Sequence, residues 1–518
     1  MNQQKKFIQK VQASYNPKGA SIFLGAGMLE GEVLPEARVN LALKMMNRHG
    51  LIAGATGTGK TRTLQLMAEQ LSDGGVPVFM LDVKGDLSGL GKAGTVNDAL
   101  IERGKTLNYP FVPAEFPIEL YSLTGNLGNP MRLTVEDFGP VMLSRILDLN
   151  DTQTGVLAAL FKYAEDQQLP LVDFADLKKL LAYLAGGAGA EAIKETYGRI
   201  STSTSGAILR KIVALEQQGV SHIFGEKEFD IFDLVDRVDG KGVISLLNIS
   251  DIQNQPVLFS TFLLSLLAQL FKQLPEVGDL DKPKLVFFFE EAHLLFKDSP
   301  KAFLTQVEQI VRLIRSKGVG VFFCTQSPTD LPESVLGQLG NRVQHALRAF
   351  TPNDADALRK AVRTYPHSEF YEIDRVITSL GTGQALITVL NDKGIPTEAV
   401  ATMLIAPRAV MGPLDAQDYE TRVRQSPFYQ KYHEKIERRS ASEIIEERNQ
   451  AHKLQQEREE LQKEKTRTKT STNRRGSTRQ TPLEAAQKAA TTTLAREGVK
   501  MLGKIANGIL ASMLGKKK

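Results

Sequence analysis

Short apolar runs alternate with amphipathic stretches along much of this chain. Strand-like runs occupy 51–53, 76–81, 242–248, 284–289, 319–325, 343–347 and 385–390, and helical spacing of apolar residues separates most of them. The run over 285–289 is apolar at every position, which indicates a strand buried on both faces of a sheet. Strands that alternate with helices are typical of a mostly parallel central sheet, so the pattern predicts an α/β fold.

Between residues 134 and 225 the strand pattern stops and helical periodicity takes over. Thr134 and Asp137 have the spacing of a capping box, Asp151 and Thr152 are candidate starts of a second helix, and residues 205–218 have amphipathic spacing. We therefore predict a helical insertion over 134–225. It divides an α/β core into 49–133 and 226–414, after a short lead-in over 1–48.

Composition changes again over 415–518, which we predict to be a charged helical tail. Residues 431–467 are dense in Glu, Lys, Arg and Gln, which favours a long exposed helix or coiled coil, and the Ser/Thr/Arg-rich segment 468–481 is typical of disorder. Apolar residues at helical spacing among lysines over 494–518 predict a basic amphipathic helix. Such a helix can lie on an anionic membrane or dock on a protein partner, and a self-packed terminal helix fits equally well.

The charge of the chain is unevenly distributed. The formal net charge is +5, but residues 461–518 carry 14 Lys and Arg against 3 Asp and Glu, so the remainder is mildly acidic. Cys324 is the single cysteine, which fits a reducing compartment. The longest apolar run, 257–271, is short for a membrane span, and the N-terminus does not resemble a signal peptide. We expect a cytoplasmic protein.

The most specific motif is a phosphate-binding loop of the form G-x-x-x-x-G-K-[ST]. It reads Gly54, Ala55, Thr56, Gly57, Thr58, Gly59, Lys60 and Thr61, with Arg62 next. It stands between the strand-like run 51–53 and a helical pattern, which is the context the motif needs. The glycines let backbone N–H groups surround a polyphosphate, Lys60 can reach the β- and γ-phosphates, and the Thr61 hydroxyl can bind Mg²⁺. The chain is therefore predicted to bind a nucleoside triphosphate through 54–62.

Two acids, Glu290 and Glu291, follow the buried strand over 285–289. Ligands of parallel sheets lie at the carboxyl ends of the strands, where these acids fall. We assign Glu290 to the metal and Glu291 to the general base that activates water. An acid pair after a strand is common on its own, so this assignment depends on the accompanying phosphate loop.

A second polar position and a set of arginines complete the candidate site. Gln326 follows the strand-like run 319–325 and can contact the γ-phosphate or its attacking water, or simply cap a turn. An arginine from a neighbouring subunit can stabilise the transferring phosphoryl group. Arg342 is the first candidate because it directly precedes a strand, with Arg312, Arg315 and Arg348 as alternatives.

Residues 40–410 resemble the HerA/FtsK group of RecA-like ATPases, and most closely the bacterial HerA-like YjgR family. The segments that carry the resemblance are 47–61, the Asp-Val-Lys-Gly-Asp loop over 82–86, the Phe-Glu-Glu-Ala-His run over 289–293, and 319–328. The resemblance implies a RecA-like fold, ATP with Mg²⁺, a homo-hexameric ring with arginines acting between subunits, and double-stranded DNA in the central pore. Glu290 stands where the family usually has Asp.

Three classes of function remain open at this point. The first is a ring ATPase that moves along or remodels DNA, with translocase or helicase activity. The second is a ring ATPase that acts on a protein or membrane-associated complex, as secretion and conjugation ATPases do, through the basic tail. The third is a small-molecule kinase, which the long interval between the phosphate loop and the acid pair disfavours. No base-reading motif separates ATP from GTP, so ATP depends on the resemblance.

Overall fold

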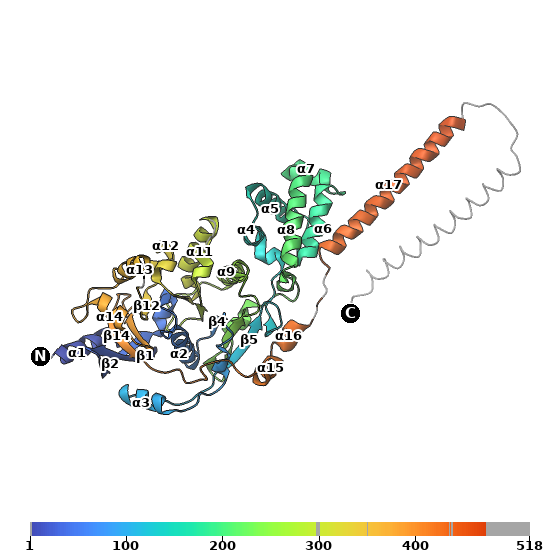
Figure 1. Cartoon of the computed structure of the whole chain (residues 1–518). Coiled ribbons are helices and arrows are strands. Elements are labelled where there is room, and N and C mark those ends of the chain that lie inside the picture. Colours follow the sequence, from blue (N-terminus) through green and yellow to red (C-terminus); the bar gives the residue numbers. More distant parts are fainter. Residues whose placement is uncertain (1–2, 297–300, 350, 435, 437–438, 473–518) are drawn as a thin grey trace. The chain divides into compact units, whose positions relative to one another are not determined.

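A single large sheet organises the chain (Figure 1). The computed structural model describes residues 3–296, 301–349, 351–434, 436 and 439–472, and it divides the chain into two units, Met1–Glu446 and Glu447–Lys518. The first unit contains a twelve-stranded sheet. In spatial order its strands are β2 (Glu32–Ala42), β1 (Ser21–Leu29), β14 (Val400–Leu404), β13 (Gln384–Thr388), β12 (Asn341–Gln344), β3 (Gly50–Ala53), β11 (Val319–Thr325), β10 (Leu285–Phe289), β4 (Val78–Asp82), β9 (Ile244–Asn248), β5 (Ile118–Ser122) and β6 (Asn129–Pro130).

The strands from β12 to β6 all run parallel, whereas β13, β14, β1 and β2 are antiparallel to their neighbours. The carboxyl ends of β3, β4, β10, β11 and β12 therefore meet at one edge, which we call the carboxyl edge. Because β13 is antiparallel to β12, the turn that leads into β13 also lies there. The predicted α/β fold with a mostly parallel sheet is confirmed.

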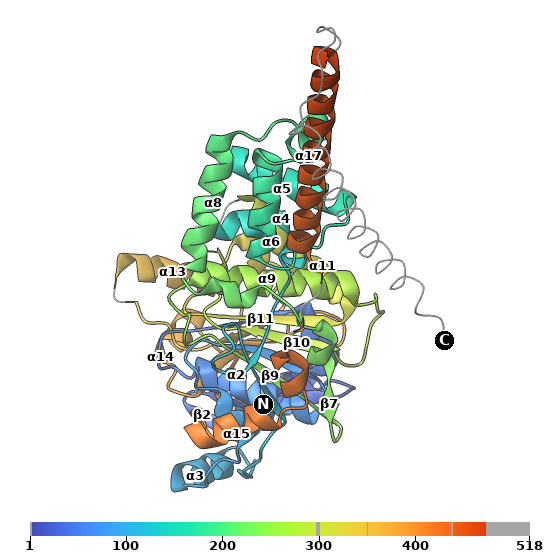
Figure 2. The ribbon, with the colours of Figure 1, turned by 90° about the vertical axis from the view of Figure 1, so that its right-hand side faces the viewer.

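Helices cover both faces of this sheet (Figure 2), because successive strand residues point to opposite sides. Leu51 and Phe287 belong to one large apolar core, and Ile52 and Phe288 belong to a second one on the opposite face. The core with Ile52 is covered by α2 (Lys60–Asp73), and the core with Leu51 by α9 (Pro256–Gln273). Other elements are α1 (Gln3–Tyr15), α3 (Asp98–Thr106), α10 (His293–Phe296), α11 (Lys301–Ile314), α12 (Glu333–Leu336), α13 (Pro352–Val362), α14 (Ile373–Ser379) and the hairpin of β7 (Arg237–Val238) and β8 (Lys241–Gly242).

Residues 134–225 form a block of helices. They are α4 (Val135–Ile146), α5 (Asp151–Asp166), α6 (Phe174–Ala185), α7 (Ala190–Tyr197) and α8 (Thr202–Glu216). The Thr134 side chain accepts the N–H of Asp137, as its spacing predicted, and α5 begins at Asp151 after an Asn150 cap. Apolar side chains of this block, such as Leu160 and Leu177, join the core beneath α9.

The boundary predicted after residue 48 does not separate a lead-in from the core. β1 pairs with β14, which lies far along the chain, and so extends the main sheet. α1 covers this extension with Phe7, Val11 and Tyr15, all buried. Antiparallel pairing between distant segments leaves no local signal, so residues 1–48 read in isolation as a lead-in.

The tail boundary predicted at 415 is also displaced. α15 (Ala416–Gln425) and α16 (Tyr429–His433) belong to the first unit, where fully buried Tyr432 stacks on Phe229 with ring centroids 5.3 Å apart. α17 (Ala441–Thr472) begins in that unit, and its side chains over 451–465 are exposed, as predicted for a long solvated helix. The helix continues to Thr472, so the disorder predicted from 468 is wrong for 468–472. Residues 473–518, including the predicted amphipathic helix, lie outside the described residues.

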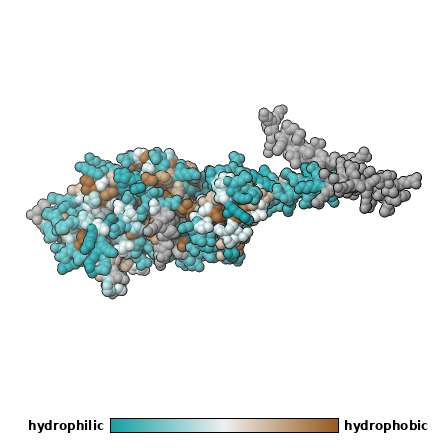
Figure 3. All heavy atoms as spheres, turned by 90° about the horizontal axis from the view of Figure 1, so that it is seen from above, coloured by the Kyte–Doolittle hydropathy of each residue, from teal (hydrophilic) through white to brown (hydrophobic). Residues whose placement is uncertain are grey.

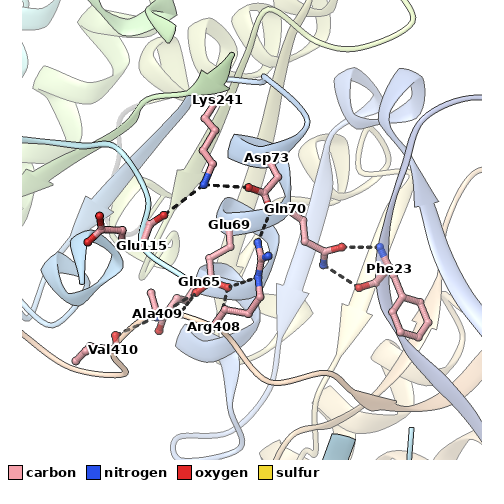
Figure 4. A network of polar contacts seen from close by, with 10 residues as sticks. All are labelled: Phe23, Gln65, Glu69, Gln70, Asp73, Glu115, Lys241, Arg408, Ala409 and Val410. Atoms are coloured by element: carbon pink, nitrogen blue, oxygen red, sulfur yellow. Dashed lines mark hydrogen bonds and ion pairs between the residues drawn. The ribbon is translucent and has the colours of Figure 1, made fainter. Parts of the chain in front are cut away.

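A segment that we call the strap, residues 406–414, connects β14 to α15 and lies along α2 (Figure 4). Its backbone bonds to successive turns of the helix. Gln65 Nε2 donates to Val410 O at 3.0 Å, and the Glu69 carboxylate accepts the N–H groups of Arg408 at 2.7 Å and Ala409 at 3.0 Å. The Arg408 guanidinium also pairs with Asp73. One polar face of α2 thus holds the strap in place.

Glu69 makes the stability of the fold depend on pH. Burial raises the pKa of Glu69 to about 7, although the N–H groups of Arg408 and Ala409 and the Arg408 guanidinium oppose the shift. Between the ordinary pKa and about 7, the folded protein therefore binds more protons than the unfolded chain, and the free energy of unfolding falls as pH rises. Glu69→Gln removes this titration.

We compare the free energy of unfolding of Glu69→Gln with that of wild type. As pH rises from 4.5 to 7.5, we expect the difference to shift by about 1–3 kcal/mol in favour of Glu69→Gln. Urea unfolding of both proteins across this range measures the difference. Exposed Glu36→Gln serves as the control, because its difference from wild type should change little. A Glu69→Gln difference that is constant with pH would contradict the prediction.

Candidate functional site

The phosphate-binding loop joins β3 to α2 at the carboxyl edge. Gly54, Gly57 and Gly59 have φ values of 156°, 79° and 110°, which L side chains rarely adopt. A Cβ at Gly54 would lie 2.5 Å from the Cβ of His345. The Lys60 ammonium lies within the loop and donates to Gly54 O at 2.7 Å and Ala55 O at 3.1 Å. Backbone conformation therefore requires glycine at all three positions, and close packing adds to the requirement at Gly54.

Glu290 lies beside the loop and is only 6% exposed. The Thr61 hydroxyl donates to Glu290 Oε1 at 3.2 Å, although the two residues are far apart in the sequence. Burial raises the pKa of Glu290 to about 7, and the nearby Asp86 and Asp82 carboxylates add to the shift. The structure therefore brings together the two residues that the sequence assigned to a metal ion.

These residues fit Mg²⁺. Glu290 Oε2 is buried without a hydrogen-bond partner, so it can accept a hydrogen bond from metal-bound water or contact the ion. Within the described residues, no group of three or more His, Cys, Asp or Glu side chains is arranged to hold a metal. A site with one carboxylate and one hydroxyl suits Mg²⁺, which keeps several waters and takes other ligands from substrate phosphates.

Glu291 is held in an unusual backbone conformation. Its φ is 50°, in the left-handed region, which costs of order 1–3 kcal/mol for a non-glycine residue. The turn places Glu291 Oε2 3.3 Å from His293 Nδ1, with the Glu291 side chain 22% exposed. A partly exposed carboxylate beside an imidazole is able to accept a proton from water. The sequence analysis assigned no role to His293. Its position two residues after Glu291 is the signal that could have suggested one.

Gln326 lies at the tip of β11, next to the strand that ends in the acid pair. It is exposed and lines a pocket of about 540 Å³ together with His293, Phe296, Thr329, Asp330, Leu331 and Pro332. Asp330 fixes this turn, because its carboxylate accepts the Thr325 hydroxyl at 2.6 Å and the Ser327 N–H at 2.9 Å. The structure thus places Gln326 and His293 in one pocket, and the contact from His293 links it to Glu291.

The structure places Arg342 apart from these groups. It pairs with Leu51 near the start of β12, away from the carboxyl edge. Its guanidinium donates to the carbonyls of Thr364 at 3.0 Å, Leu336 at 3.3 Å and Leu339 at 3.3 Å. These bonds tie β12 to neighbouring loops of the same subunit. Arg348, an alternative from the sequence, is exposed beyond the carboxyl end of β12.

A buried histidine behind the loop had no signal in the sequence. His345 follows β12, and its Nε2 lies 2.9 Å from Thr63 Oγ1 of α2. The backbone N–H of His345 donates to Ala53 O at 2.7 Å, and burial lowers the pKa of the imidazole to about 4. On the same side, Gly383 N–H donates to Thr58 O at 3.2 Å. Neutral His345 and the turn before β13 thus support the loop from the β12 side.

Comparison with known proteins identifies the family. The family model described as "Helicase HerA-like C-terminal" matches residues 28–518. The chain belongs to the HerA-like P-loop ATPases. Its phosphate loop and acid pair stand at the carboxyl ends of β3 and β10, two parallel strands on either side of β11, in accordance with this membership.

Two relatives of this HerA-like protein are archaeal, and both are named DNA double-strand break repair helicase HerA. The protein of Sulfurisphaera tokodaii is 24% identical over 388 residues, which cover 73% of this chain and 70% of the relative. That of Sulfolobus acidocaldarius is 20% identical over 391 residues, with 71% and 68% covered. The bacterial conjugative coupling protein TrwBΔN70 has a similar structure, with a TM-score of 0.50, 14% identity, and 78% and 94% covered, which shows a shared fold.

Among the residues that the structure describes, none of the helices is both long and apolar enough to span a bilayer. The apolar run over 257–271 lies within α9, whose side chains enter the core, as the sequence predicted.

Proposed function

We propose that this HerA-like protein is an ATP- and Mg²⁺-dependent motor that acts on double-stranded DNA as a homo-hexameric ring in the cytoplasm. The observation that carries the proposal is the Thr61–Glu290 contact, which assembles a phosphate and metal site at the carboxyl edge. Family membership and the helicase names of the two archaeal relatives favour DNA as the substrate.

In this proposal the phosphates bind to residues 54–62, which include Lys60. The backbone N–H groups of the loop and of the start of α2 donate to phosphate oxygens, and the helix N-terminus adds partial positive charge. The Lys60 ammonium exchanges the carbonyls of Gly54 and Ala55 for phosphate oxygens. Thr61 and Glu290 would hold Mg²⁺, which when bound neutralises charge that develops on the phosphates.

Glu291 acts as the general base. It accepts a proton from the water that attacks the γ-phosphorus, and a protonated His293, whose Nδ1 lies 3.3 Å from Oε2, would stabilise its carboxylate. Gln326, exposed in the adjoining pocket, donates to the γ-phosphate or to that water. An arginine supplied by the next subunit stabilises the transferring group. Arg342 is the candidate that the sequence predicts for this role, and Arg348, which is more exposed and donates to the carbonyls of Thr378 and Leu380, is the alternative.

We expect double-stranded DNA to stimulate steady-state ATP hydrolysis by the full chain several-fold at low salt. The stimulation should fall steeply as salt rises, because phosphate contacts release counterions. Heparin, a polyanion without a duplex, is the matched control for the basic tail and should stimulate much less. Equal stimulation by heparin and DNA, or none by either, would contradict a duplex-tracking motor.

The second candidate is a ring ATPase that acts on a protein or membrane-associated complex. The excess of positive charge over 461–518 favours it, since a basic segment binds anionic membranes and acidic partners. Vesicles containing phosphatidylserine distinguish the two functions. Hydrolysis that responds to these vesicles and not to DNA would support the second candidate.

A further inference from the structure

The strap reaches the end of α2 that carries the phosphate-binding loop. Arg62 NH2 donates to Met411 O at 3.0 Å, and Arg62 NH1 donates to Gln65 Oε1 at 3.1 Å. Met411 itself is 42% exposed, in contrast to the buried residues of α2 that lie nearby. An exposed methionine is thus fixed by its backbone beside the first turn of the phosphate-binding helix.

The geometry of α2 indicates where a nucleotide continues beyond its phosphates. Thr61 contacts Glu290 after β10, and Thr63 contacts His345 after β12, so both side chains face the sheet. Successive residues of a helix are rotated by about 100°, so Arg62 between them faces away from the sheet, toward the strap. In the nucleotide complex proposed above, the terminal phosphates lie at Lys60 and Thr61, and the next N–H at the helix start belongs to Arg62. The nucleoside therefore leaves on the side of Arg62 and Met411.

We propose that Met411, positioned by the strap and by Arg62, forms the wall against which the base of the bound nucleotide packs. The proposal rests on the nucleotide binding proposed above. A thioether is polarisable and packs favourably against aromatic rings, and a purine presents such a ring. The guanidinium of Arg62 is planar and can stack on the same base or pair with the adjoining phosphate. The site therefore binds the nucleoside as well as the phosphates, and the contact with the base adds to the affinity that the phosphates supply.

The strap residues that precede Met411 are held on α2 by hydrogen bonds (Figure 4). Val410 is bonded through Gln65, and Arg408 and Ala409 are bonded through Glu69, which is fully buried. The backbone of the strap therefore does not have to become ordered when a nucleotide binds. A preorganised contact of this kind contributes more affinity than a mobile one.

The test compares ADP with inorganic tripolyphosphate, which has phosphates and no nucleoside. Both are titrated calorimetrically into the full chain and into Met411→Ala. We expect Met411→Ala to weaken ADP binding about five- to tenfold, the size expected for a sulfur–aromatic contact with its buried area. Tripolyphosphate binding should not change, because the phosphate-binding loop is intact. Met411→Leu keeps most of the apolar contact and should restore most of the ADP affinity.

Ile395→Ala is the matched control. Ile395 is 55% exposed in the turn after β13, beyond the opposite edge of the sheet, and should leave both affinities unchanged. Unchanged ADP binding in Met411→Ala would overturn the proposal, as would equal losses for ADP and tripolyphosphate. If wild type binds neither ligand, the proposed ATPase itself fails. ADP binding by wild type that is insensitive to Met411 refutes the nucleoside wall alone.

Discussion

Replacing Glu291 with glutamine is expected to lower the kcat of ATP hydrolysis by about 10²–10⁴-fold, the usual contribution of a general base. Glutamine has nearly the shape of glutamate but cannot accept the proton from the attacking water. Nucleotide affinity should be retained, because Lys60, Thr61 and Glu290 are untouched. Steady-state hydrolysis and calorimetric titration of ADP measure the two effects separately.

The backbone at Glu291 offers a second and independent variant. Glu291→Gly removes the carboxylate and also relieves the left-handed conformation at φ 50°. Hydrolysis should be lost as in Glu291→Gln, while thermal stability is unchanged or higher. Exposed Glu333→Gln in α12 is the control and should keep normal activity. Near-normal hydrolysis by Glu291→Gln would assign the proton transfer to another group.

Lys60→Ala is expected to weaken ATP binding by about 100-fold, because each hydrogen bond to a charged group contributes about 1.5–3 kcal/mol. The ammonium already lies within the phosphate-binding loop, bonded to Gly54 O and Ala55 O. Its removal therefore deletes both the positive charge and the donors that face the phosphates. Competition with a fluorescent ADP analogue measures the loss.

Lys44→Ala is the matched control for Lys60→Ala. Lys44 forms an ion pair with Asp392 at 2.9 Å and lies in the segment before β3, outside the loop. Its replacement should leave ATP affinity within twofold of wild type, since the pair is partly exposed. If Lys60→Ala binds ATP as wild type does, the backbone N–H groups alone hold the phosphates.

Features that depend only on contiguous residues were predictable from the amino-acid sequence. The phosphate-binding loop over 54–61 carries its glycines, lysine and threonine in one run, so its chemistry needed no tertiary information. The buried strands and α9 were also predictable, because 285–289 is apolar at every position and 257–271 is apolar at most positions. Hydrophobic patterning determines such elements locally.

Features that join distant segments arose only from the folded chain. β1 and β2 extend the main sheet because β1 pairs with β14, and no pattern within 1–48 indicates a partner near residue 402. The predicted boundary after 48 was misplaced for this reason, and the boundary at 415 was misplaced because burial beyond it is not visible in the composition. α15, α16 and the first residues of α17 belong to the first unit and contribute buried side chains such as Tyr432, although their composition is that of a solvated segment.

The candidate site likewise combines features that were predictable from the sequence with features that only the folded chain decides. The residue types at 60, 61, 290 and 291 followed from motif and position, but the Thr61–Glu290 contact depends on the strand order that sets β10 and β3 on either side of β11. His345 behind the loop and Met411 beside Arg62 come from segments remote in the chain, and each acquires its place through backbone hydrogen bonds. The chain alone specifies residue types and local periodicity, whereas long-range strand pairing and burial decide which side chains meet.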